Sequence, residues 1–113
     1  MRNSLFVLFI FLACTLSKMQ GQTLAVLKYD GGGDWYSNPT AMKNLIEFCN
    51  NEINTTIASI PTVVHPEDSA LFSYPFVHMT GHGNVVFSDE ALKNLNTYLM
   101  GGGFLHIDDN YGM

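Results

Sequence analysis

Basic residues are scarce in this chain, which has five Lys and Arg against ten Asp and Glu among its 113 residues. The formal net charge of −5 provides no positive surface for nucleic acid or anionic lipid, so we expect neither as a partner. Two cysteines are too few for a disulfide scaffold or a paired-cysteine metal knuckle. The sequence is instead apolar. Its 47% hydrophobic and 13% charged residues exclude intrinsic disorder, and its length predicts one domain.

The first 21 residues predict a signal peptide. An apolar run, LFVLFIFLACTL at residues 5–16, follows one positive charge and is shorter than the roughly 20 residues that span a bilayer. We place cleavage after Gly21, so that residues 1–21 direct export to the periplasm or cell envelope and residues 22–113 form the N-terminal part of one domain. Lipidation at Cys14 and an uncleaved segment that anchors the chain in the membrane are the alternatives.

Strand-like and helix-like segments alternate along the rest of the chain. Strands are expected at residues 23–29, 61–64, 74–79 and 103–107, and helices at residues 37–50 and 88–101. The first strand is a nearly continuous apolar run, which is typical of a strand buried on both faces. This alternation predicts an α/β fold with a parallel sheet and crossover helices.

Each predicted helix has a capping signal and an apolar face. The first begins in residues 37–40, where polar side chains and a proline suit a first turn, and Ser88 caps the second. The expected apolar faces are Met42, Leu45, Ile46 and Cys49 in the first helix, and Leu92, Leu95 and Leu99 in the second. We therefore interpret Cys49 as a packed thiol rather than a reactive one.

Polar residues follow three of the predicted strands. Asp30 and Asp34 follow the first strand, His82 follows the strand at 74–79, and Asp108 and Asp109 follow the last. Because ligand sites of parallel sheets lie beyond the carboxyl ends of the strands, these loops are expected to converge on one crevice. Asp108 is the better candidate to face that crevice. For Asp109 we favour a capping role, and ligand binding is the alternative.

The glycine-rich loop DGGGDWY matches neither of the phosphate-binding glycine patterns, and its two aspartates would repel a phosphate. Two interpretations stay open. Its aromatic residues cover the core, or the loop contacts a sugar or another small polar ligand. In the second interpretation the ligand-binding residues are Asp30, Gly32, Asp34, Trp35 and Tyr36.

The second polar loop places His82 between Gly81 and Gly83, where a ligand can approach closely and the imidazole can act as acid, base or metal ligand. His78 lies on the same side as His82 if the strand continues, so His78, His82 and Asp108 form a possible metal site. The alternative is that His78 makes only local hydrogen bonds within the strand.

Two stretches, LKYDGGGDWYSNP and YPFVHMTGHGNVVFSDEALKNLNTYLMGGGFLHIDDNYGM, closely resemble a bacterial family, domain of unknown function number 4159. The resemblance covers residues 23–113. It implies a flavodoxin-like three-layer sandwich, similar to the class I glutamine amidotransferase-like group. The family's domain continues further, so the resemblance also implies that this chain is an N-terminal fragment, truncated after about half the domain. It implies no particular reaction.

Two activities of similar folds do not fit these residues. In the glutaminases the strand after the glycine-containing turn leads to a cysteine nucleophile, and here it leads to Asp108. The turn around His82 is similar to the His-Gly pair of caspase-like peptidases, but Cys49 precedes this histidine instead of following the next strand. No serine nucleophile elbow is present either, so acyl-enzyme chemistry is not expected.

Three hypotheses about function follow from the sequence. The first is a noncatalytic module of the cell envelope that binds a small polar ligand or an envelope protein through these loops. The second is a hydrolase in which His82 and Asp108 form an acid/base pair or hold a divalent metal. The third is a purely structural assembly component. The residues identify no cofactor.

Overall fold

The computed structural model describes residues 21–113. The predicted signal peptide and the lipidation alternative at Cys14 therefore lie outside the described residues, apart from Gly21 at the predicted cleavage point. Within the part of the chain that the structure describes, no helix has the length and apolar character needed to cross a membrane.

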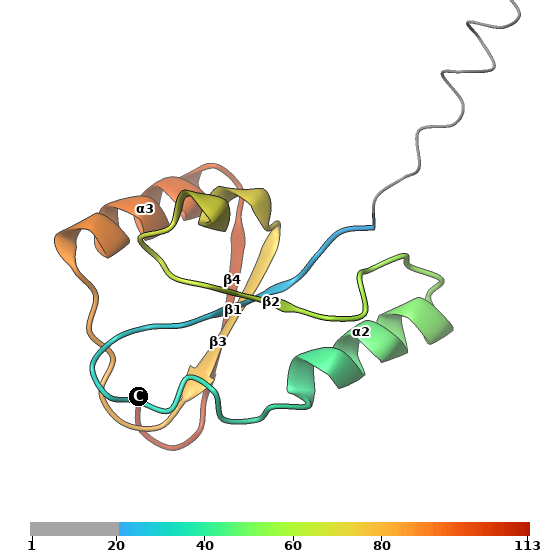
Figure 1. Cartoon of the computed structure of the whole chain (residues 1–113), viewed down its shortest axis with the longest axis horizontal. Helices are drawn as coiled ribbons and strands as arrows, with labels where there is room; N and C mark the ends of the chain where they lie inside the picture. The colour runs from blue at the N-terminus through green and yellow to red at the C-terminus, as the bar shows by residue number, and fades with distance from the viewer. Residues whose placement is uncertain (1–20) are drawn as a thin grey trace, which may run out of the picture.

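The described chain forms a four-stranded parallel sheet with helices between the strands (Figure 1). Its elements are β1 (Ala25–Leu27), α2 (Ala41–Glu52), β2 (Thr62–Val64), the 3-10 helix η1 (Ser69–Ser73), β3 (Phe76–Gly81), α3 (Asp89–Met100) and β4 (Phe104–Asp109). The strands lie in the order β2-β1-β3-β4, and every pair is parallel. The predicted α/β fold with a parallel sheet is confirmed.

Alternate residues of the strands face two different helices. On one face, Leu27 and Val77 belong to the same buried cluster as Leu95 of α3. On the other face, Val26 and Phe76 pack against a cluster that contains Ile46 of α2. Figure 1 shows α2 and α3 on opposite sides of the strands. This arrangement is compatible with a three-layer α/β fold, with the sheet as the middle layer.

The predicted strands are all present, with shifted ends. β1 is shorter than the predicted strand at 23–29, although Leu24 and Tyr29 on either side of it are also buried. β3 continues to Gly81 and β4 to Asp109, so both strands extend beyond their predicted ends at residues 79 and 107. The sequence analysis missed η1, whose Leu71 is fully buried against the sheet.

The predicted second helix is confirmed, but its buried face is not the one expected. Ser88 caps α3 by accepting a hydrogen bond from the backbone N–H of Ala91 at 3.1 Å. The residues buried in α3 are Ala91, Leu95 and Tyr98, whereas Leu92 and Leu99 are exposed. Both triplets have helical spacing. The buried one is chosen because the Tyr98 hydroxyl donates to backbone oxygens of Tyr74 and Phe104, at 2.9 and 3.2 Å.

The first helix begins later than expected. α2 starts at Ala41 after Thr40, which makes no side-chain capping bond, so the predicted capping role of residues 37–40 is wrong. Met42 and Ile46 are buried as predicted, Leu45 is exposed, and Cys49 is only partly buried. The polar side chains before α2 instead bond to the ends of β3 and β4.

Two leucines of α3 provide a matched test of this packing. Leu95 is 7% exposed and Leu99 is 47% exposed. We expect Leu95→Ala to lower the free energy of unfolding by about 2–5 kcal/mol, because it leaves a cavity beneath the helix. Leu99→Ala should cost less than about 1 kcal/mol. Urea denaturation of both variants measures the difference, and equal losses would contradict the assigned face.

Candidate functional site

Asp34 and His82 meet at the carboxyl ends of β1 and β3. Oδ2 of Asp34 lies 3.0 Å from Nδ1 of His82, and Oδ1 accepts a hydrogen bond from the His82 backbone N–H. The Asp34 backbone N–H in turn donates to the His82 carbonyl oxygen at 3.1 Å. Hydrogen bonds from His82, chiefly from its backbone N–H, hold the pKa of Asp34 below its ordinary value. Asp34 is therefore a stable carboxylate that fixes both the loop and the imidazole.

Glycine is required immediately before His82. Gly81 has φ of 151°, and a Cβ atom at this position would collide with the Tyr29 hydroxyl. That hydroxyl donates to the Thr80 carbonyl oxygen at 3.1 Å. Burial, followed by the nearby charge of Asp34, raises the pKa of Tyr29, so the phenol stays neutral and keeps its donor proton.

The imidazole of His82 offers one nitrogen to a ligand. A neutral ring that donates from Nδ1 to the ionised Asp34 carries an unprotonated Nε2, which accepts hydrogen bonds. The side chains of His82 and Asp34 are 52% and 34% exposed, so a ligand can reach both. Chemically, the pair can accept a hydrogen bond from a ligand or take up its proton.

A second polar cluster joins the loop before α2 to the ends of β3 and β4. The buried Thr80 hydroxyl oxygen accepts hydrogen bonds from the amide groups of Asn38 and Asn110, at 3.2 and 3.3 Å. The Asn110 amide also donates to the Ser37 hydroxyl at 3.2 Å, and its backbone N–H donates to the Gly81 carbonyl at 3.1 Å. The loops that follow β1, β3 and β4 therefore meet at one edge of the sheet.

The aromatic residues of the glycine-rich loop have different surroundings. Trp35 packs against the core on the α3 face, and the ammonium of Lys28 lies 5.4 Å from its ring centre. Tyr36 is 67% exposed and meets Trp35 edge to face, with ring centres 5.7 Å apart. Trp35 thus covers the core, while Tyr36 is accessible to a ligand. Gly32 is exposed, and nothing lies within 4 Å of where its Cβ would be.

The remaining acidic candidates lie around this edge. Asp30 is exposed and forms an isolated bridge with Val86. Asp108 is exposed on β4 in register with Thr80. The side chain of Asp109 accepts hydrogen bonds from the backbone N–H groups of Gly112 and Met113 at 2.7 and 3.0 Å, which is a capping contact for the turn after β4. The same turn accepts a bond from Gly83, whose N–H lies 3.0 Å from the Gly112 oxygen.

The two candidate metal-ligand histidines have different partners. His78 is buried in β3 and its ring lies against His106, whereas the ring of the exposed His82 bonds to Asp34 and not to Asp108. Across residues 21–113, no three His, Cys, Asp or Glu side chains are grouped closely enough to hold a metal ion.

Sequence reasoning missed the amide and hydroxyl groups of Ser37, Asn38, Thr80 and Asn110. Ser37 and Asn38 precede a helix, and that position resembles an ordinary capping signal. Asn38 adopts φ of 58°, a conformation that asparagine tolerates better than most residues. Asn38 and Asn110 lie in the loops that follow β1 and β4, and this shared position beyond the strands is the signal that could have indicated the cluster.

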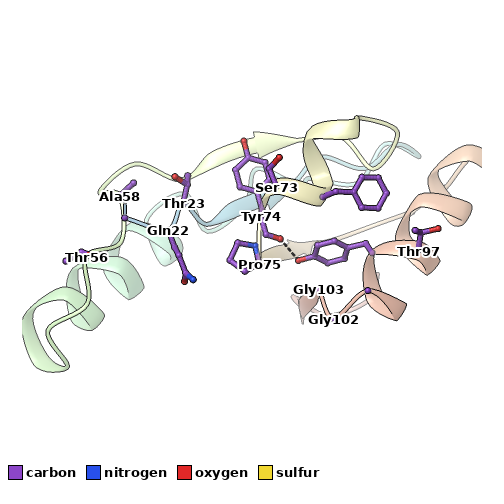
Figure 2. A pocket seen from close by; sticks show the side chains of 14 residues that line it. Gln22, Thr23, Thr56, Ala58, Ser73, Tyr74, Pro75, Thr97, Gly102 and Gly103 are labelled. Atoms are coloured by element: carbon purple, nitrogen blue, oxygen red, sulfur yellow. Dashed lines mark hydrogen bonds between the residues drawn. The ribbon is translucent and has the colours of Figure 1, made fainter. Parts of the chain in front are cut away.

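A cavity of about 970 Å³ lies at the opposite edge of the sheet, near the amino ends of the strands (Figure 2). Its described lining residues include no Asp, Glu, His, Lys or Arg. The Tyr98 hydroxyl donates to the Tyr74 backbone oxygen, so this phenol is occupied in holding α3. We therefore assign the candidate site to the Asp34–His82 edge, where the reactive side chains converge, rather than to this cavity.

The family model described as "Domain of unknown function (DUF4159)" matches residues 23–113. No curated protein matches the chain.

The lowered pKa of Asp34 predicts how acid affects stability. A carboxyl whose pKa is lower in the folded state than in the unfolded state stabilises the fold above about pH 4, and this contribution disappears as the pH falls through the folded-state value. We expect Asp34→Asn to lower the free energy of unfolding at pH 7 and to weaken its dependence on acid below about pH 4. Urea denaturation at several pH values, with Asp30→Asn as the exposed control, measures the change. If Asp34→Asn and Asp30→Asn had the same free energy of unfolding at every pH, the stabilising role of the Asp34–His82 pair would be contradicted.

Proposed function

We propose a function from the premise that this chain belongs to the DUF4159 family, a domain of unknown function. In this proposal the edge of the sheet at the carboxyl ends of its strands binds a small polar ligand without covalent chemistry. The observation that carries the proposal is the position of the Asp34–His82 pair. Asp34 follows β1 and His82 follows β3, which are neighbours in the sheet. The chain direction across the sheet reverses between these two strands, and this is where open parallel sheets bind ligands.

The sheet order also supports a finer fold assignment. The order β2-β1-β3-β4, with helices on both faces, corresponds to the first four strands of a flavodoxin-like sheet. We infer that the domain has this flavodoxin-like, class I glutamine amidotransferase-like architecture. In such a fold the connections reverse direction across the sheet between β1 and β3, and the ligand binds at this point. The fold assignment and the proposed site therefore depend on the same strand order.

The groups at this edge suit a ligand that is rich in hydroxyl groups. The Asp34 carboxylate and the Nε2 atom of a neutral His82 ring that donates from Nδ1 accept hydrogen bonds, so the ligand must donate them. The exposed ring of Tyr36 offers an apolar face, and the open surroundings of Gly32 allow close approach. Acceptors beside an aromatic face are a suitable surface for a saccharide. The predicted export of the chain would place this site in the cell envelope, where an envelope protein is the alternative partner.

Binding is favoured over hydrolysis because the nearby hydroxyl groups are already engaged. Ser37 and Thr80 both accept bonds from asparagine amides. The second candidate function is a hydrolase in which His82 and Asp108 act as an acid/base pair. One observation favours it: Asp34 holds the His82 ring in the orientation that leaves Nε2 free to accept a proton.

Titration with two saccharides, maltotriose and triacetylchitotriose, tests the proposed function. We expect amide NMR signals of residues 30–36 and 80–84 to shift on addition of at least one saccharide. His82→Ala should weaken that binding by about tenfold, which corresponds to about 1.4 kcal/mol for one lost polar contact. Tyr111→Ala is the control, because Tyr111 is 99% exposed and lies outside the proposed contacts.

Different results of this experiment would contradict the saccharide proposal and favour the hydrolase. If neither saccharide shifts the loop signals, or if both variants bind as tightly as the wild type, the saccharide proposal is wrong. Hydrolysis of a nitrophenyl ester by the wild-type chain, lost in His82→Ala, would favour the hydrolase instead.

A further inference from the structure

The loop that follows β1 is attached to the rest of the fold at three points, and one large side chain among them stays exposed. Asp34 is held by its bonds to His82, Trp35 packs against the core, and the Asn38 amide donates to a hydroxyl of β3. Tyr36 lies between these attachments and is 67% exposed. Its ring gains little burial from the fold, although its neighbours are fixed. The loop therefore presents one exposed aromatic ring on a fixed backbone.

The attachment at Asn38 depends on the hydroxyl of Thr80. This oxygen lies 3.2 Å from the Asn38 amide nitrogen and 3.3 Å from that of Asn110, and both amides donate to it. Asn110 also donates to the Ser37 hydroxyl at 3.2 Å. The two residues that directly follow Tyr36 are therefore both linked to this hydroxyl.

Asn38 needs the bond to Thr80 because of its own backbone conformation. Its φ of 58° is left-handed, which costs free energy in any residue with a side chain, although less in asparagine than in most. Such conformations persist where the surrounding structure imposes them. Here the Asn38 amide donates to Thr80, and its carbonyl accepts a bond from the Ala41 backbone N–H at 3.0 Å. The side-chain bond therefore helps to fix the turn after Tyr36.

Thr80 is itself a fixed point. It is 2% exposed, and the Tyr29 hydroxyl donates to its carbonyl oxygen at 3.1 Å. The strand pairing with β4 holds it from the other side, in register with Asp108. Because its backbone is held in this way, the Thr80 hydroxyl offers the loop an acceptor at a defined position.

We propose that Thr80 is a positioning residue, which acts through Asn38 to hold the exposed ring of Tyr36 at the Asp34–His82 edge. The role in binding rests on the proposed function, since Tyr36 is the aromatic face offered to a saccharide. A ring that is fixed before binding loses less conformational entropy when a ligand packs on it. The buried Thr80 hydroxyl thereby contributes to affinity through the loop.

Thr80→Val and Thr80→Ser are the matched variants. Valine removes the hydroxyl and serine keeps it. We expect both proteins to fold, because valine suits a buried strand position. The bonds that valine removes are only part-buried, so water can satisfy the released amides of Asn38 and Asn110.

Backbone order parameters from nitrogen relaxation test the attachment in the whole chain without any ligand. For Tyr36 and Ser37 we expect values of about 0.85 in the wild type and in Thr80→Ser, and below about 0.6 in Thr80→Val. Thr97→Val, which removes an exposed hydroxyl of α3, is the control and should match the wild type. Unchanged values in Thr80→Val, or an equal fall in Thr80→Ser or Thr97→Val, would overturn the proposal.

The His82 ring provides a second readout in the same samples. Asp34 contacts His82 without the Thr80 hydroxyl, so neutral His82 should keep its proton on Nδ1 in Thr80→Val. A change of this tautomer in Thr80→Val would show a general disturbance of the edge instead of a loss of Tyr36 positioning, and it would overturn the proposal.

A second background tests whether the effect passes through Asn38. Asn38→Ala removes the same hydrogen bond from the loop side and leaves β3 unaltered, so it decides the question even if Thr80→Val does not fold. The Tyr36 order parameter should fall in Asn38→Ala, and adding Thr80→Val should lower it by much less than in the wild-type background. No fall in Asn38→Ala, or an undiminished effect of Thr80→Val in that background, would contradict the proposal.

Saccharide titration connects this positioning to binding. For whichever of maltotriose and triacetylchitotriose binds the wild type, Thr80→Val should weaken binding by about three- to tenfold, and Thr80→Ser should bind normally. Equal binding by Thr80→Val would remove the role in affinity. If neither saccharide binds the wild type, the proposed function fails, whereas the order parameters still decide whether Thr80 positions Tyr36.

Discussion

The parallel pairing of β3 with β1 on one side and β4 on the other is the constraint on which the rest of the structure depends. It brings the carboxyl ends of three strands to one edge, where each loop can contribute a polar group. The same pairing sets His78 beside His106, because these residues are in register. Since β3 is buried along nearly its whole length, a one-residue shift of register would turn His78 and Thr80 toward the opposite, apolar face.

The two histidines of the β3 segment have opposite environments. His82 is exposed at the end of the strand and bonds to a carboxylate, which suits contact with a ligand. His78 is buried and bonds to another imidazole, which suits a role inside the sheet. Three residues separate them, one of which is Gly81 with its positive φ. The same side-chain chemistry therefore serves two purposes, which are decided by burial and by the partner of Nδ1.

Much of the fold could be predicted from the sequence, because buried parallel strands are apolar runs and helices have periodic apolar faces. Periodicity alone did not identify the right face of α3. Leu92 and Leu99 are more apolar than Ala91 and Tyr98, but burial of Tyr98 is favoured by its two backbone hydrogen bonds. The predicted convergence of polar loops corresponds to the edge where Asp34 meets His82. Which carboxylate meets His82 depends on tertiary contacts that no local pattern encodes.

The central claim is that Asp34 fixes the His82 ring so that Nε2 is the nitrogen offered to a ligand. The most direct measurement is a long-range nitrogen–proton NMR correlation of the histidine rings at about pH 8, compared with Asp34→Asn. The account predicts that neutral His82 carries its proton on Nδ1 in the wild type, and that this preference is lost in the variant. A proton on Nε2 in the wild type, or the same tautomer in both proteins, would contradict it.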